Sequence, residues 1–557
     1  MRAACLAALA VIVVACAPGT AALRAPAATP GSGDVEQTTP GRRPPAELVA
    51  SFDGLGEQFV GPQGSATGRN PSDNSLAVGP DHIVQIVNSR MAIFTKKGRR
   101  FAETGRALYG PVPTNNVFRG FGGPCEAHPN GDAVVRYDQL ADRWLIVMPL
   151  FSRAPLREHE PTPARGGEPA RTSEIGHPGQ PGPAVSLFEP PAPAPSAAPA
   201  PDQRTGPRTG PPPEKGSYGM CYAISTGSDP FGPYYRYHFV RPLFPDYPRP
   251  AVWPDGYYVP TSTGDDVVQK QACVVDRQRM LRGEPATEQC IVIDGVNFLN
   301  AADLDGRQLP PAGAPEVVLA AGGTQLKGIL SDDALFAWRF HVDWEDTTKT
   351  SLSGPVRIPV APYHYLCGGQ LTNCVPQSGT DRRLDAQGDK LMSRVVYRRI
   401  GGQESIVAAH SVASTTGGGA VRWYELRLDA ARRPVLYQQG SYAPDSGYRW
   451  MPSPAMDGLG NIGIGYSFGG LPGFAGQRFA GRLASDPPGR LTLGENVLAT
   501  GEAAQENTMR WEDYTQTAVD PSDDCTIWYV GDYLKRGATN YSTRIGAFRM
   551  PGCVGSK

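Results

Sequence analysis

Short apolar strands interrupted by tight turns recur along the chain and are its main structural signal. Six copies share one pattern, in which two or three strand-forming residues lead into a turn of Pro, Gly or Asp and then into a second apolar strand. The β-branched and aromatic residues suit pleated strands, and the turn residues suit tight reversals of the backbone. The pattern predicts an all-β fold. The copies lie at residues 77–87, 135–147, 251–259, 383–396, 455–466 and 518–530.

The spacing of these copies indicates how many units the chain contains. The turns fall at positions 79, 137, 253, 385, 457 and 520, and the steps of 58, 72 and 63 residues give room for four strands each. The step from 137 to 253 is longer because it contains a segment rich in Pro, Ala and Gly, and the step from 253 to 385 has room for two units. We expect a hidden copy at 316–344, with a strand at 334–340, which brings the number of units to seven.

A seven-bladed β-propeller accommodates this repeat, because radial repetition leaves only short, protected strand edges. A closed ring also requires its ends to be joined, and we expect strand-like residues at 48–60 to pair in the last blade beside 545–548. Residues 46–557 would then form one domain. The Pro-, Ala- and Gly-rich insertion at 153–216 is expected to be disordered, or polyproline II in part. Two separate β-sandwiches are the rival architecture.

The N-terminal residues have the features of an export signal. Residues 1–16 begin with Arg2 and continue into an apolar run that is shorter than the ~20 residues of a membrane-spanning helix. The run ends Val-Val-Ala-Cys16, which resembles the lipobox of bacterial lipoproteins, whose cysteine is lipidated. An ordinary cleaved signal is the alternative. Residues 17–45 are rich in Ala, Pro, Thr and Gly and predict a flexible tether. We expect a cell-surface or periplasmic lipoprotein, otherwise a secreted protein, that meets the membrane only through its lipid.

Cysteine usage supports export. With Cys5 and Cys16 set aside, an even number of cysteines remains, which favours disulfides in an exported chain. The sequence does not determine their connectivity, and pairing in chain order is our hypothesis. A structural zinc site is the weaker alternative, because no Cys-x-x-Cys pair is present and no histidine lies at ligand spacing from these cysteines. The hypothetical pairs are Cys125–Cys221, Cys273–Cys290, Cys367–Cys374 and Cys525–Cys553.

The net charge argues against a nucleic-acid partner, and the acidic turns give little support for a bound metal. The formal net charge is −1 and the sequence pI is about 6.7, so the chain lacks the overall basic charge expected of a nucleic-acid-binding protein. We expect a monomer without a cofactor or metal site. Acidic turns at 303–306 and 520–524 offer oxygen ligands for calcium, but neither matches a complete calcium-loop signature.

Several phrases resemble a family of large exported bacterial proteins that are mostly described as hypothetical. The resemblance covers nearly the whole mature chain apart from the tether and the insertion. It implies export and a propeller-like fold and implies no activity. Sialidase-like propellers are a more distant analogy, since residues 522–528 echo their aspartate box without its glycine. The phrases are SLAVGPDHIVQIVN (75–88), YDQLADRWL (137–145), DYPRPAVWPD (246–255), FHVDW (340–344) and RWEDY (510–514).

The residues that precede the repeats are the candidates for chemistry. The first strand of each propeller blade lines the central channel, so residues just before these strands should converge at one mouth. Candidate catalytic carboxylates, suited to acid and base work, are Asp73, Asp132, Glu512 and Asp513. Candidate ligand-binding residues, which offer arginines, amides and aromatic faces, are Asn74, Tyr247, Arg249, Arg449, Trp450, Arg510, Trp511 and Tyr514. The same rim is expected to include Asn130, Asp246, Asp381, Arg382 and Tyr448.

A structural explanation competes with each of these residues, because strand ends need hydrogen-bond partners and tryptophans pack between blades. Three hypotheses follow. The favoured one is a binding protein that presents its mouth to an extracellular glycan or protein, since no catalytic motif stands out. The alternative is a hydrolase or lyase acting on a carboxylated polysaccharide, which requires two carboxylates ~5–10 Å apart in one pocket. A surface structural protein without a small ligand is the weakest.

Overall fold

The computed structural model describes residues 35–151, 185–186, 218–262, 269–294, 298–322, 333–369 and 372–555. The predicted export signal, lipidation at Cys16, most of the tether and nearly all of the insertion lie outside these residues. The described chain is all-β, with two short α-helices, α1 (Gly123–Ala127) and α2 (Arg277–Arg282). None of its described helices has the length and apolar character that a membrane span requires.

Most of the described strands fall into sets of four that follow one another along the chain and pair antiparallel. The first set is β5 (Ser75–Val78), β6 (His82–Val87), β7 (Arg90–Thr95) and β8 (Ala107–Pro113). The second is β9 (Val134–Asp138), β10 (Arg143–Leu150), β12 (Tyr218–Ser225) and β13 (Pro233–Arg241), with β11 (Val185–Ser186) beside β13. The third is β14 (Ala251–Val252), β15 (Tyr257–Tyr258), β16 (Lys270–Val275) and β17 (Glu288–Ile293).

The fourth and fifth sets join into one curled sheet, because β18 pairs parallel with β24. The N-terminal strand β1 (Glu36–Gln37) adds to its edge by pairing parallel with β27. The fourth set is β18 (Asn300–Asp305), β19 (Glu316–Ala321), β20 (Ala334–His341) and β21 (Ser351–Pro359). The fifth is β24 (Val395–Ile400), β25 (Gln403–Ala413), β26 (Gly419–Leu428) and β27 (Pro434–Tyr442). The expected copy at 316–344, with its strand at 334–340, corresponds to β19 and β20.

The last two sets complete the arrangement. The sixth is β28 (Tyr448–Met456), β29 (Ile462–Gly469), β30 (Gly476–Arg482) and β31 (Asn496–Ala499). The seventh takes β32 (Gln516–Val519), β33 (Thr526–Tyr533) and β34 (Ser542–Arg549) from the C-terminal region and β2 (Glu47–Asp53) from the N-terminal one. Two hairpins lie outside the sets, β3 (Val60–Gly61) with β4 (Gly64–Ser65) and β22 (Asn373–Gln377) with β23 (Thr380–Asp385). Short 3-10 turns occupy η2 (Thr114–Phe118), η3 (Thr347–Lys349) and η4 (Leu366–Gly368).

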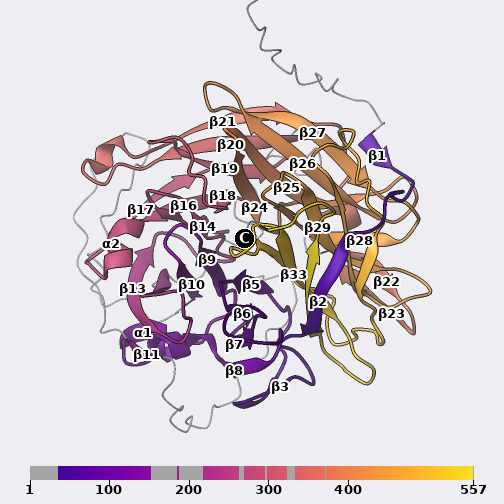
Figure 1. The fold of residues 1–557 in the computed structure, drawn as a ribbon, viewed down its shortest axis with the longest axis horizontal. Helices are drawn as coiled ribbons and strands as arrows, with labels where there is room; N and C mark the ends of the chain where they lie inside the picture. The colour runs from indigo at the N-terminus through magenta and orange to yellow at the C-terminus, as the bar shows by residue number, and fades with distance from the viewer. Residues whose placement is uncertain are drawn as a thin grey trace, which may run out of the picture.

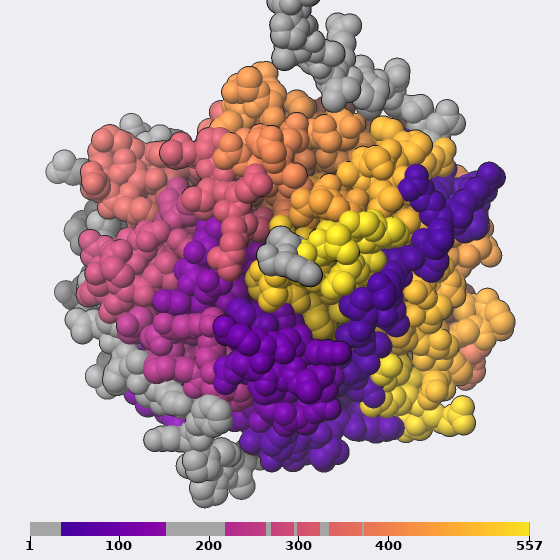
Figure 2. Space-filling view, in the orientation of Figure 1, coloured from indigo at the N-terminus to yellow at the C-terminus, as the bar shows by residue number. Residues whose placement is uncertain are grey.

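The two ends of the chain meet in the seventh set, as the sequence predicts. Leu48 of β2 lies opposite Phe548 of β34, and Phe52 lies opposite Ile545. The innermost strands surround a common centre (Figure 1), and β32 lies against both β28 and β5. Figure 2 shows the C-terminal segment near the middle of the face in view.

The hydrophobic core is divided among the interfaces between neighbouring sets. Ile93 of the first set packs in one cluster with Val135 of the second, and Phe94 packs in another with Val530 of the seventh. Phe479 of the sixth set stacks on Phe548 of the seventh, with ring centroids 4.3 Å apart. Each set is therefore stabilised by its two neighbours, which is the packing expected of a ring.

One predicted repeat is misplaced. The turn expected at 385 between the first two strands of a unit is absent, because Asp385 ends β23 of the separate hairpin. The innermost strand of the fifth set is β24, and its turn into β25 lies at Gly401 and Gly402. The segment between β23 and β24 is buried without strand pairing, and Ala386 and Met392 pack in a hydrophobic cluster. Strand-forming residues lie on both sides of this buried loop, so its sequence has the pattern of the repeat although no hairpin forms there.

The cysteine hypothesis is confirmed. All four disulfides pair in chain order, as Cys125–Cys221, Cys273–Cys290, Cys367–Cys374 and Cys525–Cys553. These eight cysteines therefore cannot form the alternative zinc site. Four disulfides suit an oxidising compartment, extracellular or periplasmic.

Candidate acidic mouth

Carboxyl groups from distant parts of the chain gather where the innermost strands begin. Asp73 lies two residues before β5, Asp132 two residues before β9 and Asp513 three residues before β32. The backbone N–H of Asp73 donates to the carbonyl of Glu512 at 2.8 Å, which joins the starts of β5 and β32. We name Asp73, Asp132, Asp246, Asp385 and Asp513 together the acidic mouth.

A shared backbone conformation precedes several of these strands. Asp73, Asp132 and Asp513 have φ values of 49°, 59° and 76°, and Tyr247, before β14, has a φ of 47°. This left-handed region is uncommon for residues other than glycine, although Asp tolerates it better than most. Such residues cluster at functional sites, because only a surrounding structure that fixes the chain can hold them there.

The carboxyl groups of the acidic mouth are close enough to interact directly. Those of Asp73 and Asp132 lie within hydrogen-bonding reach of each other, and Asp132 also reaches Asp246. Arg510 pairs with Asp513 and lies 3.4 Å from the Asp385 carboxylate. Asp73 is 2% exposed and Asp385 is fully buried, whereas the other three are half-buried. Solvent thus reaches the side chains of Arg510 and Asp513, which are 27% and 16% exposed, whereas Asp73 and Asp385 are shielded from it.

This crowding makes the carboxyl groups hard to ionise. Burial, together with the charge on Asp513, raises the pKa of Asp73 well above its usual range. Burial and the charges on Asp73 and Asp246 raise the pKa of Asp132 in the same way. Burial also raises the pKa of Asp385 to about 7. Burial and mutual repulsion thus favour the protonated form of the Asp73 and Asp132 carboxyls relative to carboxyls in water.

An aromatic layer lies beside the carboxyls. The rings of Tyr247 and Tyr514 stack with centroids 4.2 Å apart. The Arg249 guanidinium lies 3.5 Å from the Tyr247 ring centroid and 4.3 Å from that of Phe298. The Tyr514 hydroxyl interacts electrostatically with Asp132 and Asp73, and it has no hydrogen-bond partner although the residue is 3% exposed. The structure thus brings three predicted ligand-binding residues, Tyr247, Arg249 and Tyr514, together with the carboxyls.

Other predicted site residues are held inside the core. The Glu512 carboxylate accepts hydrogen bonds from the Gln477 side chain and the Asp532 N–H, both at 2.7 Å. Asn74 donates to the Asp532 carboxylate at 2.7 Å. Trp511 donates to Ser467 at 2.8 Å. These contacts, deep between the sixth and seventh sets, position the 510–514 segment and leave Asp513, Arg510 and Tyr514 to form the mouth.

The sixth set holds two more predicted residues in structural contacts. Arg449 is fully buried and forms ion pairs with Asp445 and Glu495, both at 2.8 Å. Trp450 is also fully buried and packs near Trp511, with ring centroids 6.1 Å apart. The nearby Tyr448 is half-buried in the same strand. On the second set, Asn130 donates to the carbonyl of Pro149 at 3.1 Å.

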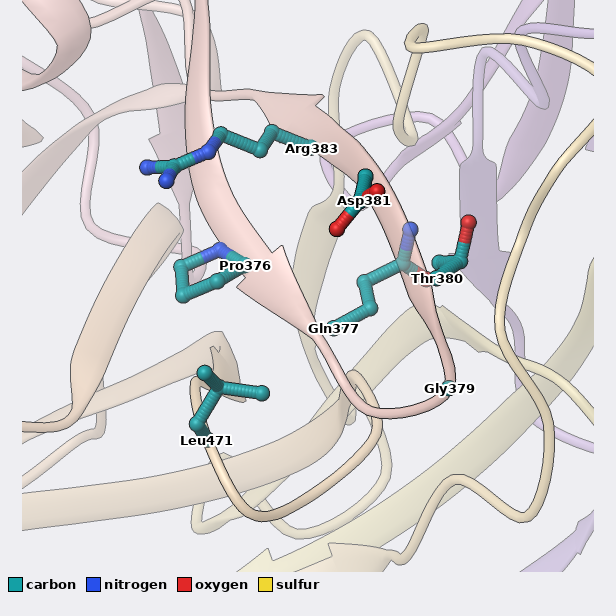
Figure 3. A pocket seen from close by; sticks show the side chains of 7 residues that line it. All are labelled: Pro376, Gln377, Gly379, Thr380, Asp381, Arg383 and Leu471. Atoms are coloured by element: carbon teal, nitrogen blue, oxygen red, sulfur yellow. The ribbon is translucent and has the colours of Figure 1, made fainter.

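Two predicted rim residues lie on the β22–β23 hairpin instead, where Asp381 and Arg382 are exposed. This hairpin and the loop at Leu471 enclose a shallow pocket of about 430 Å³. Figure 3 shows the Pro376 and Leu471 side chains at its apolar side, and Asp381 on the neighbouring strand. Gln377 donates to the carbonyl of Gln505 at 3.0 Å, which ties the hairpin to the segment that leads into Arg510. The pocket lining is Pro376, Gln377, Gly379, Thr380, Asp381, Arg383 and Leu471.

Sequence reasoning missed several residues around the mouth. Asn88 donates to the Asp73 carboxylate at 2.6 Å from the end of β6. Lys390 lies 4.2 Å from the Phe298 ring centroid and donates to Gln387 at 3.0 Å. The repeat pattern assigns Asp385 to a turn instead of to the mouth. None of these residues directly precedes an innermost strand, so the repeat pattern held no signal for them.

No protein-family model and no curated protein matches this sequence. Among solved structures, the chain is similar to a protein of unknown function from Dyadobacter fermentans at 10% identity and a TM-score of 0.33, covering 91% of this chain and 100% of that one. It is also similar to an α-L-arabinofuranosidase from Lactobacillus brevis at 11% identity and a TM-score of 0.26, covering 55% and 91% of the two chains. An engineered GH43 glycoside hydrolase with endo-xylanase and exo-arabinofuranosidase activity is similar at 9% identity and a TM-score of 0.25, covering 91% and 98%. Likenesses this slight carry none of the argument below.

Proposed function

We propose that this protein is an exported seven-bladed β-propeller that binds an extracellular glycan at its acidic mouth. The seven-bladed architecture is supported by the consecutive four-stranded sets, by their cyclic packing and by the closure of the last set with β2. Export is supported by the four disulfides and by the signal-like N-terminal sequence.

One observation carries the binding proposal. Carboxyl groups from separate sets converge with Arg510 at a place that solvent reaches. Carboxylates accept hydrogen bonds from sugar hydroxyls, and a guanidinium donates to hydroxyl, ring or carboxylate oxygens. The half-buried groups Asp132, Asp246, Asp513 and Arg510 are the ones that a glycan would contact first.

A hydrolase or lyase is the second candidate, and the Asp73–Asp132 pair favours it. A protonated carboxyl next to an ionised one supplies an acid and a base in one place. Binding remains the better-supported function, because these two carboxyls are within hydrogen-bonding reach. The paired carboxyls of glycosidases are ~5–10 Å apart, which leaves room for the substrate and a water.

A glycan-array screen of residues 46–557, with product release from each bound glycan followed by mass spectrometry, tests the proposal. Binding without turnover, weakened by Asp132→Asn and Asp513→Asn, is expected. Asp346→Asn is the matched control, because Asp346 lies on an exposed turn and pairs there with Lys349. Binding with turnover that these variants abolish would establish the enzyme instead. Silence on every glycan would refute both candidates and direct the search to protein partners.

A further inference from the structure

We propose that the pocket between the β22–β23 hairpin and the loop at Leu471 binds a sugar unit that carries a carboxylate, such as a uronic acid. This inference rests on the proposed glycan binding, and it adds the chemical class of the glycan and a contact site outside the acidic mouth. The pocket has a volume of about 430 Å³, within the range of about 300–1,000 Å³ that is usual for small-molecule sites. It is therefore large enough for one sugar ring.

Hydrogen bonds fix the two walls of the pocket relative to each other. At the tip of the hairpin, the Ser378 N–H donates to the carbonyl of Gly473 at 3.0 Å, and the Ser378 hydroxyl donates to the carbonyl of Pro472 at 2.7 Å. Nearer the core, the buried Gln377 side chain accepts a hydrogen bond from the Gln505 N–H at 2.8 Å. Walls that are already held in place lose little conformational entropy when a ligand binds.

The pocket has an apolar side and a polar side. Pro376 and Leu471 form the apolar side, and Thr380 and Asp381 lie on the neighbouring strand (Figure 3). Single exposed leucines are common on protein surfaces, but Leu471, at 68% exposure, shares this pocket with polar side chains. A sugar ring has C–H groups on its faces and hydroxyls around its edge. Its C–H groups can pack on Pro376 and Leu471 while its hydroxyls donate to the Asp381 carboxylate.

Arg383 supplies the positive charge of the pocket. It is exposed on β23, and its guanidinium donates to the carbonyl of Cys374 at 3.3 Å. Within the part of the chain that the structure describes, Arg383 forms no ion pair, whereas Arg394 and Arg449 each pair with two carboxylates. The bond to the carbonyl orients the guanidinium and leaves its other N–H donors for a ligand. A guanidinium binds a carboxylate through two parallel hydrogen bonds, which suits a carboxylated ligand.

Asp381 determines how the ligand is oriented. Asp381 and Arg383 both line the pocket from β23, and two residues of a strand span about 7 Å. No ion pair joins these two side chains in the described structure. A ligand carboxylate is attracted to Arg383 and repelled by Asp381, so it lies at the Arg383 end of the pocket. A neutral sugar lacks this contact, and the pocket should therefore select the charged unit.

Strand β23 leads from the pocket to the acidic mouth. It ends at Asp385, whose carboxylate accepts a hydrogen bond from the Trp511 N–H at 2.9 Å and lies 3.4 Å from Arg510. Arg383 lies two residues earlier, so about 7 Å of strand separates it from Asp385. The carboxyls of the mouth repel a second carboxylate. The arrangement thus assigns the carboxylated unit to the pocket and neutral units of the same glycan to the mouth.

Saturation-transfer NMR on the full mature chain tests the pocket with single sugars. The probes are sodium glucuronate and sodium galacturonate, and glucose and galactose are the neutral controls. A dissociation constant on the order of 1 mM is expected for at least one uronate, given the size of the ligand. The neutral sugars are expected to bind about tenfold more weakly or less, because they lack the charge-assisted hydrogen bonds to Arg383.

Two variants of the pocket should change uronate binding in opposite directions. Arg383→Met removes the charge and keeps an apolar side chain, and it is expected to weaken binding about tenfold. Asp381→Asn removes the repulsion and is expected to strengthen binding about two- to fivefold, as for an exposed charge interaction. Arg433→Met is the matched control, because Arg433 is 61% exposed on the β26–β27 turn and pairs there with Asp429. It should leave binding unchanged.

Three outcomes would overturn the proposal. These are no uronate signal up to about 20 mM, well above the expected dissociation constant, uronate binding that Arg383→Met does not weaken, or neutral sugars that bind as tightly as uronates. Near-UV circular dichroism identifies a variant that fails to fold, and the other variant then decides.

The same experiment separates the pocket from the mouth. Asp132→Asn, at the mouth, should leave the binding of single uronates unchanged. If uronates bind through Arg383 while no glycan depends on Asp132, the mouth proposal fails and the pocket stands. If glycan binding depends on Asp132 while no uronate binds, the pocket proposal fails and the mouth stands.

Discussion

Replacing Lys96 by Met tests whether the first and last sets are locked together. Lys96, just after β7, reaches across to the turn after β32 and contacts the Asp520 carboxylate at 2.6 Å. The two side chains are 5% and 8% exposed. The Lys96 ammonium also donates to the Ser522 hydroxyl at 3.0 Å. The contact joins residues 424 positions apart, so it exists only when the ring is closed.

The expected decrease in the free energy of unfolding follows from the bonds that Lys96→Met removes and from the Asp520 carboxylate that it leaves without a cation. A hydrogen bond between charged groups contributes about 1.5–3 kcal/mol, and a second bond to a hydroxyl about 1 kcal/mol. Lys96→Met also leaves Asp520 buried without its cation, although the Ser522 N–H and the Trp528 indole still donate to it. Breaking one side of a buried pair typically costs about 3–5 kcal/mol. We expect a decrease of about 3 kcal/mol in the free energy of unfolding, at the lower end because those two donors remain.

Guanidinium unfolding followed by tryptophan fluorescence measures this loss. Lys349→Met is the matched control, because Lys349 lies 3.3 Å from Asp346 with both side chains well exposed. Exposed pairs contribute about 0.2–1 kcal/mol. A double-mutant cycle with Asp520→Asn should recover most of the loss as coupling. A loss for Lys96→Met no larger than that for Lys349→Met would refute the closed ring.

Three further predictions concern the disulfides, acid stability and anchoring. Replacing Cys125 and Cys221 by serine opens a loop with a sequence separation of 96, so urea unfolding should show that the free energy of unfolding decreases by about 4–5 kcal/mol. Opening the Cys367–Cys374 disulfide, with a separation of 7, should decrease it by about 2 kcal/mol. Equal decreases would contradict the loop-entropy argument. Burial lowers the pKa of His410 to about 3. The folded state therefore binds this proton less tightly than the unfolded state, so stability should fall as the pH drops from about 6.5 towards 3, by about 2 kcal/mol at pH 5. His410→Gln should flatten that part of the curve, and an unchanged slope would exclude His410 as its source. Cys16→Ala should abolish palmitate labelling of the chain and release it into soluble fractions, whereas labelling that persists would refute the lipobox interpretation.

The repeat predicted from sequence succeeded where the signal is local. Strand residues and turn residues adjoin each other in every copy, so propensity predicts six innermost hairpins. Five of these six predictions were correct. The pairing of 48–60 with 545–548 followed from the need to close a ring. The exception at 385 shows the limit of the pattern, because a buried loop between two strands has the same apolar sequence pattern as a hairpin.

The direction in which each side chain points could not be predicted from the same sequence pattern. Glu512 and Asp513 are adjacent, yet one is bonded inside the core and the other lies at the mouth. The difference arises from consecutive left-handed residues, with φ values of 57° and 76°, which no propensity specifies. The repeat pattern predicts that Arg449 precedes a strand as Arg510 does, but Arg449 lies within β28, where it forms buried ion pairs with Asp445 and Glu495. Long-range partners therefore decide which polar residues lie at the mouth.

The central claim is that strand entrances far apart in the sequence meet at one acidic mouth of a closed ring. A crystal structure of residues 46–557 tests it most directly. We expect β2 to pair with β34, and the carboxyl groups of Asp73 and Asp132 to lie within hydrogen-bonding reach of each other. A β2 that does not pair with β34, or carboxyl groups of Asp73 and Asp132 that lie apart, would contradict the account.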